Sequence, residues 1–134
     1  MLEVEFLGGF AQYLGLRTVE ATGDRVVLEL ELRPELQQPH GIVHGGVHTT
    51  LVETAASVGA TLWFGDEGRV VGVSNQTDFL RAARGGRLVA TATPIHRGRL
   101  QQLWLVEVTG EDDRTVARGQ VRLQNLRTEQ TAGR

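Results

Sequence analysis

The sequence predicts an α+β fold in which an antiparallel β-sheet wraps around one long helix. The first observation is the order of the elements, which are two strands, one long helix and then four strands. The second is that short turns join the strands, which favours antiparallel pairing because parallel strands need long crossovers. The third is that the long helix is apolar around much of its circumference, as expected of a helix enclosed by a sheet.

The helices are expected from the spacing of apolar residues. Residues 3–14 can form a short amphipathic helix, although two adjacent glycines weaken it. The long helix is expected over residues 46–64, where apolar residues recur every three or four positions, and Gly65 and Asp66 end it. The recurring residues are Val47, Leu51, Ala55, Val58 and Leu62.

The strands are expected where apolar and polar residues alternate between turn residues. The expected ranges are 15–22, 25–33, 69–80, 87–96, 100–109 and 114–125. We expect a single domain over residues 1–134, with an N-terminal helical segment within 1–14 and a polar, frayed tail over 128–134.

The composition is that of an ordinary globular protein, with 40% hydrophobic and 22% charged residues. A net charge of −2 gives no reason to expect a nucleic acid or a membrane surface as partner. No apolar run approaches the roughly 20 residues that span a bilayer, and the N-terminus lacks the basic start of a signal peptide. We therefore expect a cytoplasmic protein.

The residues that are absent narrow the possible chemistry. The chain has no cysteine, which excludes thiolate nucleophiles, and no lysine, which excludes Schiff bases. Its two serines, Ser57 and Ser74, lie outside any G-x-S-x-G motif. All 14 basic residues are arginines, which are well suited to binding phosphates.

A candidate oxyanion hole lies at His44-Gly45-Gly46, where a loop becomes the long helix. The first N–H groups of a helix lack internal acceptors, and the helix dipole adds positive potential there. Glycine lets a ligand oxygen approach such an N–H closely. Taken alone, the two glycines are somewhat better explained by a tight turn.

A candidate catalytic carboxylate, Glu53, lies within an apolar stretch of the long helix, with Ser57 four residues later on the same face. Thr49 and Ala60 extend this stripe. A carboxylate on an enclosed helix is either satisfied by its neighbours or placed for a reaction. The alternative is a solvated face of a partly exposed helix.

The spacing of these groups predicts a dimer. Gly45 and Glu53 are eight residues apart, about 12 Å along one helix, whereas a reacting carbonyl must lie about 3 Å from both. One chain therefore cannot supply both groups to one site. Two antiparallel helices related by a two-fold axis can, which gives two composite sites per dimer.

Two further clusters of side chains have the composition of a binding site. His40, His44 and His48 have a spacing that could hold a metal on a helix, but the intervening glycines and proline oppose a continuous helix there, so we expect no metal site. Several arginines flank glycine-containing turns and as a group could hold the phosphates of coenzyme A, although any single one is equally well explained as a solvated charge at a turn. They are Arg81, Arg84, Arg87, Arg97 and Arg99.

At these residues the chain resembles the hotdog-fold thioesterase superfamily, in the branch of the phenylacetate-pathway, 4-hydroxybenzoyl-CoA and 1,4-dihydroxy-2-naphthoyl-CoA thioesterases. The resemblance covers residues 10–125. The matching text is Gln38-Pro39-x-Gly41-x-x-His44-Gly45-Gly46, then Leu51-Val52-Glu53-Thr54, then Ser57.

The resemblance implies a role for each matching residue. The Gly45 N–H polarises the thioester carbonyl, Gln38 orients the carbonyl or the water, and His44 positions the thioester. Glu53 of the partner subunit acts as nucleophile or general base, with Ser57 in support. Glu at 53 and Gln at 38 favour aromatic acyl groups. The candidate substrate-binding residues are Gly46, Thr49, Phe79, Arg81, Arg84, Arg97 and Arg99.

The resemblance also implies a homotetramer built as a dimer of dimers, with coenzyme A as part of the substrate and no other cofactor. Phe79 stands where naphthoyl-CoA-type members have a histidine, and Gly72 stands where some members have a serine. The expected function is hydrolysis of an aromatic or medium acyl-CoA. The alternatives are a non-catalytic acyl-CoA-binding protein and a hotdog-fold acyl-CoA dehydratase.

Overall fold

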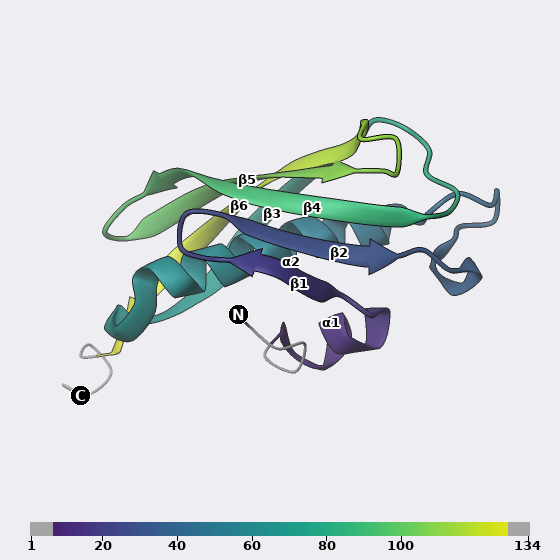
Figure 1. Ribbon diagram of the computed structural model, residues 1–134. Coiled ribbons are helices and arrows are strands. Elements are labelled where there is room, and N and C mark those ends of the chain that lie inside the picture. The colour runs from purple at the N-terminus through teal and green to yellow at the C-terminus, as the bar shows by residue number, and fades with distance from the viewer. Residues whose placement is uncertain (1–6, 129–134) are drawn as a thin grey trace.

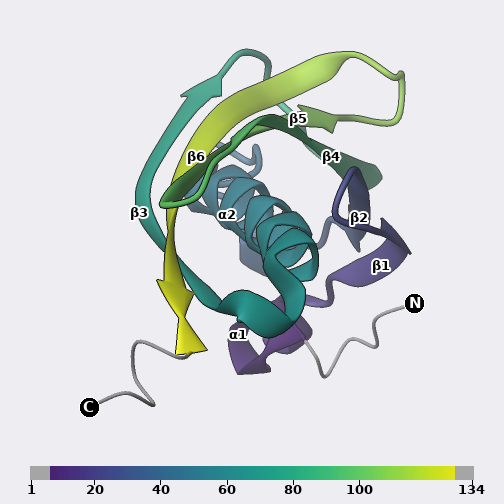
Figure 2. The ribbon, with the colours of Figure 1, turned by 90° about the vertical axis from the view of Figure 1, so that its left-hand side faces the viewer.

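The computed structural model describes residues 7–128, and in it six strands form one antiparallel sheet that curves around a long helix, α2 (Gly45–Phe64) (Figure 1). The strand order across the sheet is β1-β2-β4-β5-β6-β3. Viewed along α2, the sheet wraps the helix from β3 round to β1, and α1 lies on the open side (Figure 2). The predicted α+β architecture is confirmed.

The elements agree closely with the ranges that the sequence predicts. Their bounds are α1 (Gly9–Leu14), β1 (Arg17–Ala21), β2 (Val26–Glu31), a 3-10 turn η2 (Pro34–Leu36), α2, a 3-10 turn η3 (Gly65–Glu67), β3 (Gly68–Phe79), β4 (Arg87–Arg97), β5 (Gln101–Thr109) and β6 (Thr115–Arg127). No helix within residues 7–128 is long and apolar enough to cross a membrane.

The N-terminal helix is shorter than expected. Residues 3–6 of the expected range lie outside the described residues, and α1 begins only at Gly9. Gly8 precedes it with φ 94°, a left-handed conformation that a continuous right-handed helix does not allow. The helix ends at Gly15, which also has positive φ and whose N–H bonds back to Ala11.

Small residues on the inner face of the sheet and on α2 allow the helix to pack closely against the strands. Inner positions of β4 carry the small buried residues Ala90 and Ala92, and the centre of β5 carries Trp104, which is fully buried. A Cβ added at Gly59 of α2 would lie 2.6 Å from the Trp104 ring. Glycine at this position therefore lets the helix rest directly on the indole.

Strand β3 is the long free edge of the sheet. Its 12 residues pair with β6, and its other side faces no strand within residues 7–128. Val71 and Val73 on this strand are 41% and 54% exposed. A bulge between Gly72 and Ser74 shifts the register of the strand. A long edge with exposed apolar side chains is prone to pair with another chain.

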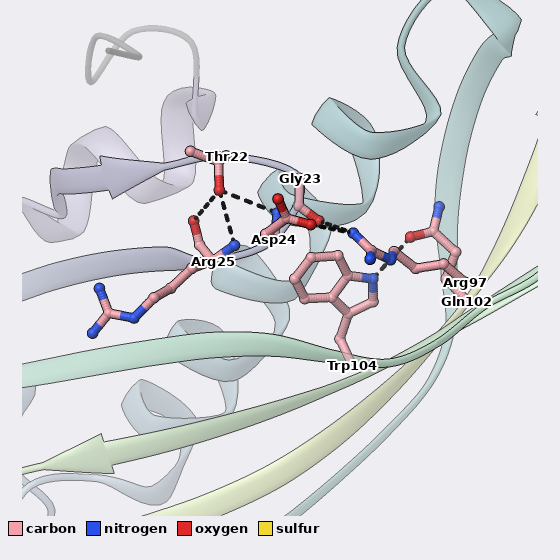
Figure 3. A network of polar contacts seen from close by, with 7 residues as sticks. All are labelled: Thr22, Gly23, Asp24, Arg25, Arg97, Gln102 and Trp104. Carbon is pink, nitrogen blue, oxygen red and sulfur yellow. Dashed lines mark hydrogen bonds and ion pairs between the residues drawn. The ribbon is translucent and has the colours of Figure 1, made fainter.

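A buried polar network ties the C-terminal half of α2 to the sheet. The amide nitrogen of Gln102 donates to the Ala60 carbonyl oxygen at 3.2 Å and to Asn125 Oδ1 at 2.9 Å. Gln102 Oε1 accepts from Trp104 Nε1 at 2.8 Å (Figure 3). Gln102 is fully buried, so no water can replace it as the partner of the Trp104 N–H and of Asn125 Oδ1. Nearby, the Arg97 guanidinium fastens the turn between β1 and β2 (Figure 3).

His48, near the start of α2, is buried without such a network. Its side chain is 2% exposed, and its Nδ1 atom has no hydrogen-bond partner among residues 7–128. Burial lowers the pKa of His48 from 6.5 to about 4, because the charged form loses its hydration. His48 is therefore neutral near pH 7.

The first prediction concerns the buried network. We expect Gln102→Leu to lower the free energy of unfolding by roughly 2–4 kcal/mol, because it leaves the Trp104 N–H and Asn125 Oδ1 buried without partners. Denaturant titration measures the effect. The adjacent Gln101 is exposed, so Gln101→Leu serves as the control and is expected to change stability by less than about 0.5 kcal/mol. Equal losses in both variants would contradict this account.

The second prediction concerns acid. Because the pKa of His48 is lower in the folded chain, the unfolded chain binds more protons between pH 6.5 and about 4. The contribution of neutral His48 to the free energy of unfolding is therefore complete above pH 6.5. It falls by roughly 3 kcal/mol as the pH is lowered to about 4. We expect His48→Leu to remove this part of the slope in urea titrations at stepped pH, and His96→Leu, at an exposed histidine, to retain it. An unchanged slope in His48→Leu would exclude this origin.

Candidate active site

The start of α2 leaves one backbone donor free. His44 is the N-cap, in an extended conformation, and its Nδ1 accepts the N–H of Gly46 at 2.8 Å. The His44 carbonyl accepts the N–H of Val47 at 2.9 Å. The N–H of Gly45 has no acceptor within residues 7–128. The helix dipole makes this free N–H a donor site for a negatively charged or strongly polarised oxygen.

Phe79 lies directly against this helix start. A Cβ added at Gly45 would be 2.7 Å from two ring carbons of Phe79, so only glycine fits beneath the ring as it stands. Phe79 is itself 59% exposed. Gly45, Phe79 and Gln38 line the same hollow, which has a volume of about 300 Å³.

Gln38 reaches this hollow from a tight turn. Its carbonyl oxygen accepts the N–H of Gly41 at 3.0 Å, and Gly41 has φ 80°, which favours glycine. The side-chain oxygen of Gln38 accepts the N–H of His40. The side-chain NH₂ therefore remains as the group that can donate into the hollow beside Gly45.

Glu53 faces β3 and is held there by a residue that the sequence did not single out. Asn75 Nδ2 donates to Glu53 Oε1 at 3.4 Å and to the Thr49 carbonyl at 3.2 Å, while its own oxygen accepts from Thr77 at 2.7 Å. A Cβ added at Gly72 would lie 3.3 Å from Glu53 Oε2, so this glycine gives the carboxylate room. The available signal was an asparagine inside a strand, where it is disfavoured.

Ser57 shares a second hollow with Glu53, one of about 340 Å³ between α2 and α1. The expected stripe is correct at Thr49, Glu53 and Ser57 but wrong at Ala60, which is fully buried. Thr61 occupies that side of the helix instead and lines the hollow. The reason is helical geometry, because the position four residues after Ser57 lies more directly above it than the position three after.

One chain keeps the two halves of the expected site apart. The hollow at Gly45 and Gln38 shares no lining residue with the hollow at Glu53 and Ser57. Eight residues of α2 separate Gly45 from Glu53, about 12 Å along the axis. No single carbonyl can therefore contact both groups within one protomer.

The other expected binding residues are divided between the two ends of the sheet. Arg81 lines the hollow beside Gly45, and Arg84 lies next to Gly41. Arg97 and Arg99 follow the opposite end of β4, and the Arg97 guanidinium donates to Gly23 O at 2.6 Å and Asp24 Oδ1 at 2.8 Å. One chain thus presents Arg81 and Arg84, and not all four arginines, beside the helix start.

Gly46 and Thr49, two of the expected substrate-binding residues, form hydrogen bonds within the start of α2. The N–H of Gly46 is taken by His44, and the Thr49 hydroxyl donates to the Gly45 carbonyl at 3.1 Å. The three neighbouring histidines also have separate surroundings, because His44 caps the helix and His48 is buried. Within residues 7–128, no group of three His, Cys, Asp or Glu side chains is arranged to hold a metal ion.

Comparisons with known proteins identify the family to which the chain belongs. Residues 40–117 match the family described as the thioesterase superfamily. A Mycobacterium tuberculosis protein with the provisional name of an esterase is 51% identical over 120 residues, 87% of this chain and 86% of that protein. The 1,4-dihydroxy-2-naphthoyl-CoA hydrolase of Listeria monocytogenes is 32% identical over 106 residues, 79% of this chain and 86% of that protein.

A solved structure gives the same result for the fold. The crystal structure of AziG from S. sahachiroi superposes with a TM-score of 0.88 and 53% identity, covering 90% of this chain and 98% of that one. The family match spans the helix start, all of α2 and the strands β3, β4 and β5. This chain therefore belongs to the thioesterase superfamily, and it is a thioester hydrolase with the hotdog fold that its sequence predicts.

Proposed function

We propose that this enzyme hydrolyses an aromatic or medium acyl-CoA to the free acid and coenzyme A. The observation that carries the proposal is the Gly45 N–H at the positive end of α2, which has no acceptor among residues 7–128 and borders a hollow large enough for an acyl group. A relative named for hydrolysing 1,4-dihydroxy-2-naphthoyl-CoA supports the aromatic class.

In the proposed reaction the thioester carbonyl oxygen accepts the Gly45 N–H, which stabilises the negative charge that develops there. The NH₂ group of Gln38 donates to the carbonyl or to the water, and the Nε2 edge of His44 faces the thioester. Glu53 either removes a proton from water or attacks the acyl carbon itself, with Ser57 in support. Both routes consume one water, break the C–S bond and release coenzyme A as the thiol. No further cofactor takes part.

The proposed site is shared between two subunits. The free edge of β3 supports this arrangement, because antiparallel pairing of β3 with its copy would continue the sheet and set the two α2 helices side by side. Glu53 lies against β3 through Asn75 and so lies close to that edge. Gly45 of one subunit would then meet Glu53 of the other. A tetramer made of two such dimers remains part of the proposal.

The proposed substrate contacts follow from the same hollow. Phe79 and Gly46 would border the acyl group and the thioester, and Thr49 would flank them on α2. Arg81 and Arg84 are the arginines that one protomer places beside the helix start, so they are the proposed ligands of the coenzyme A phosphates. Arg97 and Arg99 could contribute only from another subunit. The proposed location is the cytoplasm.

The test of the proposal is Glu53→Gln, assayed by thiol release from benzoyl-, 4-hydroxybenzoyl-, dihydroxynaphthoyl- and hexanoyl-CoA. We expect kcat to fall by about 100- to 10,000-fold, because the amide neither attacks nor accepts a proton. Glu107 is an exposed glutamate on β5, so Glu107→Gln is the matched control and is expected to retain activity. Wild-type kcat in Glu53→Gln, with unchanged folding by circular dichroism, would remove Glu53 from the mechanism.

The composite site has its own test. Gly45→Val and Glu53→Gln are each expected to be inactive, the first because its side chain collides with Phe79. When the two variants are mixed under conditions that exchange subunits, half of the dimers are mixed and each contains one intact site. We therefore expect about one quarter of the wild-type activity to return. A site contained in one chain would give no recovery at any mixing ratio.

A further inference from the structure

Asn75 is an amide on the inner face of β3, and the proposed reaction gives it no role. Its neighbour Gln76 is exposed on the outer face of the strand, whereas Asn75 is half-buried and pairs with the buried Val121 of β6. Asparagine is disfavoured inside strands, so one that faces inward indicates a specific polar contact. The contact here is with α2, the helix that carries Glu53.

The side-chain amide of Asn75 is held by two hydrogen bonds that do not involve Glu53. Its nitrogen donates to the Thr49 carbonyl oxygen of α2 at 3.2 Å, and its oxygen accepts from the Thr77 hydroxyl at 2.7 Å. The bond to Glu53 Oε1, at 3.4 Å, is the longest of the three. The strand and the helix backbone therefore set the position of the amide, and the carboxylate meets a donor that is already in place.

The surroundings of the amide also decide which of its ends faces Glu53. A backbone carbonyl and a carboxylate oxygen accept hydrogen bonds, so the NH₂ group of Asn75 is the end that faces Thr49 and Glu53. The Thr77 hydroxyl donates to the other end. Thr77 has room to do so because Gly119 lies opposite it on β6, where an added Cβ would stand 2.8 Å from the Thr77 hydroxyl oxygen. Thr77 thus reaches Glu53 through Asn75.

The two oxygens of the Glu53 carboxylate have different surroundings. Oε1 accepts from Asn75, whereas Oε2 has no hydrogen-bond partner among residues 7–128 and lies beside Gly72. A Cβ added at Gly72 would stand 3.3 Å from Oε2, so a larger side chain there would crowd this oxygen. A carboxylate that is held through one oxygen presents the other in a defined direction, and defined geometry contributes much of the rate of an enzymatic reaction.

We infer that Asn75 is a positioning residue of the reaction, which holds Oε1 of Glu53 and leaves Oε2 as the oxygen that attacks the acyl carbon or removes the proton from water. Thr77 supports this role by fixing the orientation of the amide. The inference rests on the proposed function, because it concerns the carboxylate that the proposed reaction uses. Asn75 acts through Glu53 and not on the substrate, so its removal affects kcat and leaves substrate binding unchanged.

The first test is Asn75→Leu, which removes the donor and keeps a side chain of similar size. We expect kcat to fall by about 100-fold, because the carboxylate loses its fixed direction, while KM changes by less than about 3-fold. Gln76→Leu replaces an amide on the outer face of the same strand and is expected to keep both constants within about 3-fold. Wild-type kcat in Asn75→Leu, or an equal loss in both variants, would overturn the inference.

The second test determines whether Thr77 acts through Asn75. Thr77→Val keeps the shape of the side chain and removes the hydroxyl, so the amide is free to turn, and we expect kcat to fall by about 3- to 10-fold. In the Asn75→Leu background the same change should have no further effect. Equal losses in both backgrounds would contradict the inference. Because Thr77→Val is nearly isosteric, it also tests the inference if Asn75→Leu does not fold.

A measurement that needs no turnover separates failure of this inference from failure of the proposed function. The chain has two asparagines, so labelling with ¹⁵N-asparagine gives two side-chain amide signals, from Asn75 and Asn125. Asn125 donates to the Gly98 and Arg99 carbonyls and is the internal reference. We expect Glu53→Gln to shift the Asn75 signal and to leave the Asn125 signal in place.

The combination of this spectrum with the activity assay distinguishes the two failures. If the Asn75 signal responds to Glu53→Gln but the wild-type protein hydrolyses no acyl-CoA, the amide holds the carboxylate and the hydrolysis proposal is wrong. If the wild-type protein is active but the Asn75 signal does not respond, the proposed function stands and the positioning role of Asn75 is wrong.

Discussion

The N–H of Gly45 is the group on which the other features of the site depend, because it is the backbone donor at the start of α2 that no acceptor within residues 7–128 satisfies. His44 caps the next N–H, and the glycine leaves space that Phe79 covers. A free donor of this kind is useful only if the helix cannot shift to pair it. The sheet provides that rigidity by enclosing α2, and the contact between Gly59 and Trp104 sets how closely the helix lies on the strands.

The length of α2 then determines what one protomer can do. An α-helix rises about 1.5 Å per residue, so Glu53 stands two turns from Gly45 and opens into a different hollow. Asn75 donates to the carboxylate from β3, which is the strand whose outer side faces no other strand in the described part of the chain. The same strand therefore orients the acid and offers the surface through which a second copy could bring its own helix start. In the proposed dimer, β3 therefore both contacts the catalytic acid and forms the interface between subunits.

Sequence patterns predicted the strands and α2 to within two residues at nearly every boundary, because alternation and helical spacing report directly on one buried face. The N-terminal helix was placed too early because positive φ at Gly8 is a property of the backbone that spacing does not reveal. Gly45, Gln38 and Glu53 are predicted from a spacing that resembles the family, and their catalytic roles stay predictions. The contact of Asn75 with Glu53 and the burial of His48 could not be predicted, because both depend on tertiary packing.

The two ends of α2 differ in whether their polar groups have hydrogen-bond partners. The paired end stabilises the fold, and the unpaired end is the one that can bind a ligand. At the C-terminal half, Gln102 satisfies the Ala60 carbonyl, the Trp104 N–H and Asn125 together, so the network anchors the helix. At the N-terminal half, the Gly45 N–H lacks a partner within residues 7–128. Unpaired polar groups lower stability, and a fold retains them where a ligand can pair them. The well-anchored end of the helix thus allows the other end to remain open to a substrate.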